Sequence, residues 1–210
     1  MFGIVNFGAF IIAGVLLNLT PGTDTVFILG KSLSNGRTDG IKAALGIGAG
    51  SLVHTLFATL GLSVILAESA LAFNIVKYLG AAYLVFLGLK AVLSSGKKGY
   101  SLSSNSRHPK KGRTFLSAVL TNVLNPKVAL FYLAFLPQFI DQNYANPMLS
   151  FLILGITFTF TVTIWCLLLA VYSARFSMAL QSNQLLGSWL DRVTGLLFIS
   201  LGLKLALSKQ

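Results

Sequence analysis

FIIAGVLLNLTPGTDTVFIL, residues 10–29, returns 105 residues later as FLSAVLTNVLNPKVALFYLA, residues 115–134. Both stretches are apolar, and each carries a proline near its middle, Pro21 in the first and Pro126 in the second. A second pair of similar stretches, LGLKAVLS at 87–94 and LGLKLALS at 201–208, follows at a shift of 114. Apolar sequences share letters by chance, but matched prolines together with the common LGLK predict two related halves.

Apolar segments long enough to cross a bilayer recur in both halves. Hydrophobic residues make up 55% of the 210 residues and charged residues only 10%, too few to cover the surface of a soluble domain. Six segments are expected to be membrane helices: residues 4–33, 41–66, 71–93, 115–139, 148–172 and 187–207. The first is too long for one straight span, so it must tilt, break or extend beyond the membrane. Five spans with one re-entrant segment is the competing arrangement.

Three segments in each half determine how the halves are oriented. With an odd number of spans, consecutive halves lie in opposite orientations, and such inverted repeats are typical of secondary transporters. We therefore expect an all-α integral membrane fold with three-helix repeats at 1–94 and 114–210, joined by a basic cytoplasmic linker at 95–113. The first helix of each repeat is expected to be broken at its proline.

The basic residues predict the orientation in the membrane. The chain has 16 Lys and Arg against 5 acids, a formal net charge of +11. With the N-terminus outside, 12 of the 16 fall on the inner side, 3 fall outside, and Lys127 lies within a span. This distribution suits anionic lipid head groups and gives no indication of a nucleic-acid partner. The N-terminus lacks the basic start of a cleavable signal, so the first helix is expected to be retained.

Helix starts are predicted inside two spans. In the first, Thr20 is expected to be the N-cap, Pro21 the first helical residue, and Asp24 a member of the first turn, next to Gly22. In the second, the N-cap is expected to be Asn125 and the first helical residue Pro126. A break at mid-bilayer frees backbone groups that lipid cannot satisfy, so the breaks are expected to face a polar cavity. A simple proline kink is the alternative.

Three ionisable residues, Asp24, His54 and Lys127, fall near the middle of their spans, where charge is costly. Asp24 is a candidate for a substrate ammonium or for a proton, and Lys127 for a substrate carboxylate. A direct pair between Asp24 and Lys127, or a Lys127 that snorkels, would make both structural. His54 ends the stripe Gly46-xxx-Gly50-xxx-His54 and is either a proton relay or a packed histidine bonded to a backbone carbonyl.

Two asparagines complete the candidate site. Asn18 and Asn122 lie close to the breaks, where each is expected either to line the cavity or to bond the freed backbone. The single cysteine, Cys166, excludes a disulfide within the chain and a cysteine-based metal site. We expect no metal and no cofactor.

Two longer motifs resemble the LysE/RhtB family of bacterial amino-acid exporters. Residues 17–56, LNLTPGTDTVFILGKSLSNGRTDGIKAALGIGAGSLVHTL, are similar to its N-terminal signature, and residues 120–140, LTNVLNPKVALFYLAFLPQFI, to its second. One departure is Thr23, where many members carry a second proline. The resemblance covers nearly the whole chain and implies a multi-pass protein of the bacterial cytoplasmic membrane that exports amino acids or their derivatives, driven by an ion or proton gradient. Its matched motif residues here are Pro21, Gly22, Asp24, Asn125, Pro126 and Lys127.

The favoured reading is an amino-acid exporter that works by alternating access, with protons as the coupling ion and no enzymatic activity. Efflux of another small cation or a drug is the first alternative, although a single mid-span acid argues against a divalent-metal site. An intramembrane enzyme is less favoured, because the chain has neither clustered acids nor paired histidines in its spans. A structural scaffold would not explain charges at mid-bilayer. The glycine stripe suits internal packing or a homodimer equally well.

Overall fold

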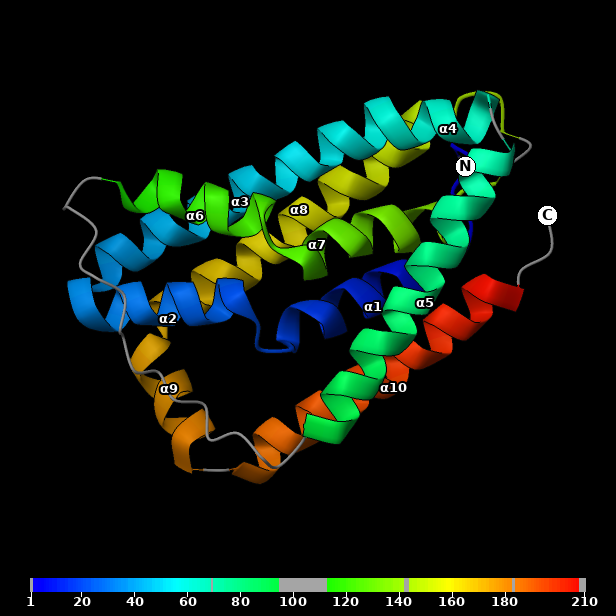
Figure 1. The fold of residues 1–210 in the computed structure, drawn as a ribbon. Helices are drawn as coiled ribbons and strands as arrows, with labels where there is room; N and C mark the ends of the chain where they lie inside the picture. The colour runs from blue at the N-terminus through cyan, green and yellow to red at the C-terminus, as the bar shows by residue number, and fades with distance from the viewer. Residues whose placement is uncertain (1, 69, 95–112, 142–143, 183, 208–210) are drawn as a thin grey trace.

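The computed structural model describes residues 2–68, 70–94, 113–141, 144–182 and 184–207, and within these ranges every regular element is a helix. One isolated antiparallel bridge joins Ile4 to Ile140. Figure 1 shows the helices as one bundle. Except for Arg113, the linker expected at 95–113 lies outside the described residues.

Each of the six predicted segments corresponds to a helix or to a chain of short helices. The first half contains α1 (Phe7–Leu19), α2 (Thr23–Asn35), α3 (Arg37–Phe57), the π-helix η1 (Ala58–Leu62), α4 (Ser63–Glu68) and α5 (Ala70–Ser94). The second contains α6 (Thr114–Val123), α7 (Pro126–Leu130), the π-helix η2 (Phe131–Phe135), the 3₁₀ helix η3 (Leu136–Phe139), α8 (Pro147–Val171), α9 (Ser173–Ser182) and α10 (Gln184–Leu207). The short α9 was not predicted, because its sequence lacks a membrane-length apolar run.

Both predicted breaks are present. The chain bends by 51° between α1 and α2 and by 47° between α6 and the helical stretch Pro126–Phe139. In the described part of the chain, residues Arg37–Ile65 and α8 are each long and apolar enough to cross a membrane, and each bent pair counts as one further candidate, giving up to four spans. The arrangement of six spans in two inverted repeats stays a prediction.

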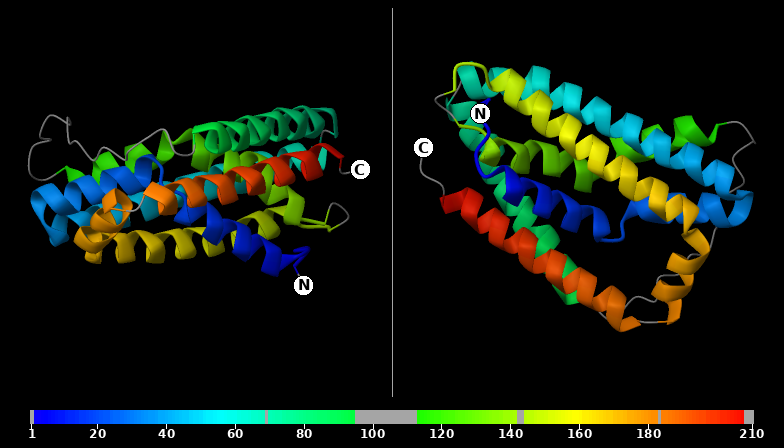
Figure 2. Two further views of the ribbon diagram at one scale, coloured as in Figure 1. Left: turned by 90° about the horizontal axis from the view of Figure 1, so that it is seen from below. Right: turned by 180° about the vertical axis from the view of Figure 1, so that it is seen from behind.

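The α3 helix lies at the centre of the half of the bundle that carries the breaks. It packs against α2, α6 and α8, which run beside it in Figure 1 and again from behind in Figure 2. Its glycine stripe makes this possible, because a Cβ at Gly46 would press against the Phe115 carbonyl and the Ala118 side chain. At Gly50 a Cβ would lie 2.7 Å from the Cβ of Asn122. The stripe therefore serves packing inside the chain and brings α3 against the length of α6.

The α5 and α10 helices form a second close pair. Cβ atoms at Gly88 and Gly195 would each meet the other glycine's carbonyl oxygen, at 2.5 and 2.7 Å. This pair meets the rest of the bundle at an aromatic cluster, in which the ring centroids of Phe131 and Phe158 lie 4.3 Å apart. Phe158 belongs to α8 and forms part of the wall of the cavity described next.

Candidate functional site

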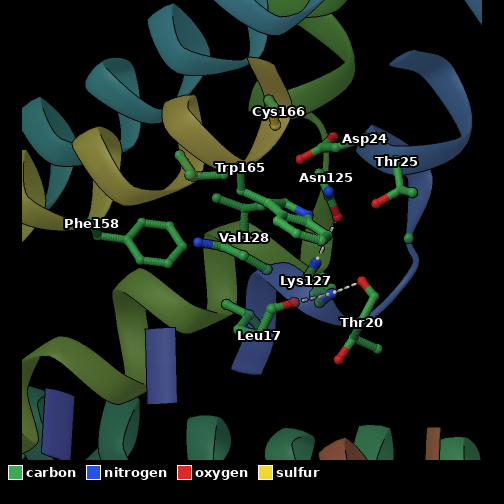
Figure 3. Close-up of a pocket in the computed structure, with 13 residues that line it drawn as sticks. Leu17, Thr20, Asp24, Thr25, Asn125, Lys127, Val128, Phe158, Trp165 and Cys166 are labelled. Atoms are coloured by element: carbon green, nitrogen blue, oxygen red, sulfur yellow. Dashed lines mark hydrogen bonds between the residues drawn. The ribbon is translucent and has the colours of Figure 1, made fainter. Parts of the chain in front are cut away.

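A cavity of about 30 Å³ lies where the two helix breaks meet. It is lined from α1, α2, α7 and α8 and from the two breaks, as Figure 3 shows. Six of the ten predicted site residues line it: Asn18, Thr20, Gly22, Asp24, Asn125 and Lys127. The volume suffices for one or two water molecules and is too small for an amino acid. In this structure the cavity therefore has no room for an amino acid.

Lys127 fastens the second break to the first. Its ammonium donates hydrogen bonds to the backbone carbonyl of Leu17, at 2.9 Å, and to that of Thr20, at 3.0 Å (Figure 3). These carbonyls end α1, where the break removes their helical partners. A cation suits the negative end of a helix dipole. Lys127 thus satisfies backbone groups at the break and places a positive charge in the cavity wall.

Asp24 holds a different partner. Its Oδ2 accepts a hydrogen bond of 2.8 Å from Nδ2 of Asn122, at the end of α6. The two mid-span charges therefore face one cavity while each is held by its own neighbours, Asp24 by an amide and Lys127 by carbonyls. Lys127 also acts on Asp24 electrostatically, and a direct pair between the two stays the structural alternative.

His54 lies behind this wall, outside the cavity lining. Its Nε2 is 3.1 Å from the carbonyl oxygen of Asn122, and since a carbonyl only accepts, Nε2 must carry the hydrogen. The ring is 7% exposed and stacks on Tyr132 at 5.5 Å between centroids. His54 thus makes the backbone bond expected of a packed histidine, and its role as a proton relay stays a prediction. Asn122 links His54 to Asp24, because its carbonyl accepts from His54 and its side-chain amide donates to Asp24.

The capping prediction is right for the second break and wrong for the first. Asn125 is the N-cap of α7, with its Oδ1 accepting from the Lys127 backbone N–H at 3.0 Å, and Pro126 is the first helical residue. At the first break α2 begins at Thr23, its N-cap is Gly22, and Pro21 lies in the extended connection.

Thr20 instead ends α1. Its hydroxyl bonds back to the Leu16 carbonyl at 3.0 Å, so it is engaged on the helix before the break rather than on the helix after it. The chain needs extended residues to turn between α1 and α2, which displaces the start of α2 toward Thr23. The prediction that Asp24 lies in the first turn is confirmed.

Four predicted site residues lie off the cavity lining: Pro21, His54, Asn122 and Pro126. The prolines shape the breaks, while Asn122 is fully buried and joins Asp24 to His54. Sequence reasoning missed the contribution of α8, whose residues on the cavity are Phe158, Val162, Trp165 and Cys166. Their spacing of four, three and one marks a helix face, but α8 is apolar on all sides, so nothing in its sequence distinguishes that face.

Three polar atoms in this wall are buried without a hydrogen-bond partner among the described residues. They are Oδ1 of Asp24, Nδ2 of Asn18 and Nε1 of Trp165. Leaving such groups unpaired costs about 1–3 kcal/mol each. One acceptor on a carboxylate and two N–H donors around a single cavity are groups that a ligand carrying both charges would satisfy.

A cluster of hydroxyls lies deeper in the bundle. The Tyr132 hydroxyl is 2.9 Å from those of Ser51 and Thr55, and that of Thr159 lies 3.0 Å from Ser51. All four residues are buried and come from α3, η2 and α8. The cluster bonds η2, the π-helix that follows α7, to α3 and α8.

Comparison with known proteins identifies the family of the chain. The family model of the LysE type translocator matches residues 15–209. The membrane protein YrhP of Bacillus subtilis is 33% identical over 95% of this chain and 98% of its own length. A leucine efflux protein of Enterobacter sp. is 32% identical over 98% of this chain and 97% of its own, and one of Salmonella choleraesuis is 29% identical. No solved structure matches the chain.

The match runs through both breaks and through α8, so it includes the whole cavity. The relatives are bacterial, and YrhP is a membrane protein by name, in agreement with the location in a bacterial cytoplasmic membrane expected from the sequence. The chain is an integral membrane protein that belongs to the LysE type translocator family.

Proposed function

We propose that the chain exports amino acids or amino-acid derivatives across the cytoplasmic membrane, as a secondary transporter driven by the proton gradient. One observation carries the proposal: the Asp24 carboxylate and the Lys127 ammonium line one mid-span cavity. Such a pair is complementary to a zwitterion. Asp24 would receive the substrate's ammonium, and Lys127 its carboxylate.

The proposed mechanism is alternating access of two inverted three-helix repeats. The breaks at 20–22 and 124–125 supply points at which the helix halves can swing, and the 30 Å³ cavity must widen before an amino acid fits. Lys127 links the two breaks in this structure, so its bonds to Leu17 and Thr20 are the ones that a substrate carboxylate would weaken.

A coupling proton has two candidate sites, Asp24 and His54, which meet at Asn122. A substrate ammonium and a proton would compete for the Asp24 carboxylate. Binding of a proton would then release the substrate, which couples proton movement to export. The direction of transport rests on the family and on the two relatives named as efflux proteins, not on the residues themselves.

The test is efflux from proteoliposomes loaded with a mixture of labelled amino acids, with and without an imposed pH gradient. We expect loss of at least one class of amino acid, faster with the gradient. An efflux rate that is the same with and without the pH gradient would contradict coupling to protons. No loss of any amino acid from folded, inserted protein would overturn it and favour another small cation or a drug as cargo.

A further inference from the structure

A larger, apolar groove opens beside the cavity. It has a volume of about 220 Å³ and runs between α1 and α8, with Val15 and Leu19 on one side and Ile164 and Leu168 on the other. By comparison, a closed apolar cavity of about 150 Å³ accommodates a benzene ring. The groove therefore has room for the side chain of leucine or phenylalanine, whereas the polar cavity has none.

Asn18 and Trp165 line both spaces. They carry the two unpartnered, buried N–H groups of the wall, Nδ2 of Asn18 and Nε1 of Trp165. In the view of Figure 3 the Trp165 indole lies between Asp24 and Lys127. Its ring is supported from α9 by Phe176, which meets it edge-on at 5.9 Å between centroids.

These two donors indicate which occupant the groove would take. A lipid tail has no acceptor for an N–H group, so an acyl chain in the groove would leave both donors unpaired. A carboxylate at the boundary accepts from both, and an apolar group attached to the same molecule then has the groove beside it. An α-amino acid also carries an ammonium, which can donate to Oδ1 of Asp24, an atom without a hydrogen-bond partner among the described residues.

We propose that Asn18 and Trp165 donate hydrogen bonds to the substrate carboxylate that Lys127 attracts, and that the groove receives the side chain, so that the preferred cargo is an amino acid with an aliphatic or aromatic side chain. This rests on the proposed function and adds a substrate class to it. Trp165 is then a specificity-determining residue, and the apolar residues of the groove decide the size of the side chain.

The first test is Trp165→Phe, which keeps an aromatic ring and removes the N–H. The leucine concentration for half-maximal transport is expected to rise about tenfold, because a hydrogen bond to a charged group is lost, while the maximal rate and the melting temperature stay unchanged. Trp189→Phe is the matched control, since Trp189 lies on α10 with 62% of its surface exposed. An unchanged half-maximal concentration in Trp165→Phe would overturn the role of Trp165.

The second test fills the groove with Ile164→Trp. Ile156 is the control, since it is the same residue on the same helix, 50% exposed against 44% for Ile164, and lies outside the groove. Wild-type proteoliposomes are expected to prefer leucine over alanine by about tenfold or more. Ile164→Trp should abolish this preference by slowing leucine alone, and Ile156→Trp should keep it.

The outcomes separate the two proposals. Transport in which glycine, threonine or lysine is preferred, or in which Ile164→Trp slows every amino acid equally, would overturn the groove as a side-chain site and leave the proposed function intact. Absence of transport for every amino acid in the wild type would instead overturn the proposed function itself.

Discussion

The ammonium of Lys127 lies 2.9 Å from the backbone carbonyl of Leu17, so a side chain from the second helix break closes the end of the helix before the first. At the repeat's shift of 105 residues, Leu17 corresponds to Asn122. The Asn122 carbonyl is also bonded by a basic side chain, His54, at 3.1 Å. A side-chain nitrogen from another segment thus bonds a carbonyl near the end of each broken helix, as expected where lipid cannot satisfy backbone groups.

Lys127→Met is expected to destabilise the protein. It removes the donor to Leu17 and Thr20 and leaves both carbonyls without it in a buried setting, at a cost of about 2 kcal/mol or more. For a chain of this size the melting temperature in detergent should fall by about 4–8 °C. Lys42→Met is the control, because Lys42 is 56% exposed in a surface pair with Asp39 and its loss should shift the melting temperature by about 2 °C at most. Equal shifts in the two variants would contradict the account of the break.

Gly46→Ala tests the packing of α3 on α6. The added methyl would press on the Phe115 carbonyl and Ala118, and such overpacking costs about 1–3 kcal/mol. Gly30→Ala adds the same methyl in the middle of α2, where nothing lies within 4 Å. Thermal unfolding should show a lower melting temperature for the first variant and an equal or higher one for the second. A Gly46→Ala protein as stable as the wild type would mean that α3 and α6 are less close than described.

Tyr132→Phe tests the hydroxyl cluster. Removing the hydroxyl takes away a partner of both Ser51 and Thr55 and should cost about 1–3 kcal/mol, read as a lower melting temperature. Tyr78→Phe makes the same chemical change at a side chain that is 55% exposed, and should be close to neutral. Indistinguishable melting temperatures would show that the buried cluster contributes nothing to stability.

The sequence predicted what backbone chemistry enforces. Pro21 and Pro126 indicate the breaks because proline lacks a backbone donor. Asn125 indicates its own cap because its side-chain oxygen can accept from an unpaired backbone N–H of the first helical turn. Thr20 failed as a cap because a threonine hydroxyl serves the preceding turn equally well. Whether the Thr20 hydroxyl bonds to the helix before the break or to the helix after it depends on the bend between α1 and α2, which the local sequence does not predict.

Long-range placement was the part that the sequence could not supply. The sequence alone does not decide whether His54 is a proton relay or a packed histidine, since the carbonyl that it bonds is 68 residues away. Trp165 was missed because an aromatic residue in an apolar helix carries no sign of which side faces a cavity. Only the arrangement of α8 against the two breaks brings its N–H to the polar wall.

The most direct test of the central claim is efflux of labelled amino acid from proteoliposomes with Asp24→Asn. An asparagine oxygen can still accept from Asn122, so the wall is retained and only the charge that would bind the substrate ammonium is lost. Asp39→Asn is the control, an acid held by Asn35 and Lys42 away from the cavity. We predict at least about a tenfold loss of efflux in Asp24→Asn and near-normal efflux in Asp39→Asn. Wild-type efflux from Asp24→Asn would contradict the claim and leave Asp24 as a residue of the first turn of α2 alone.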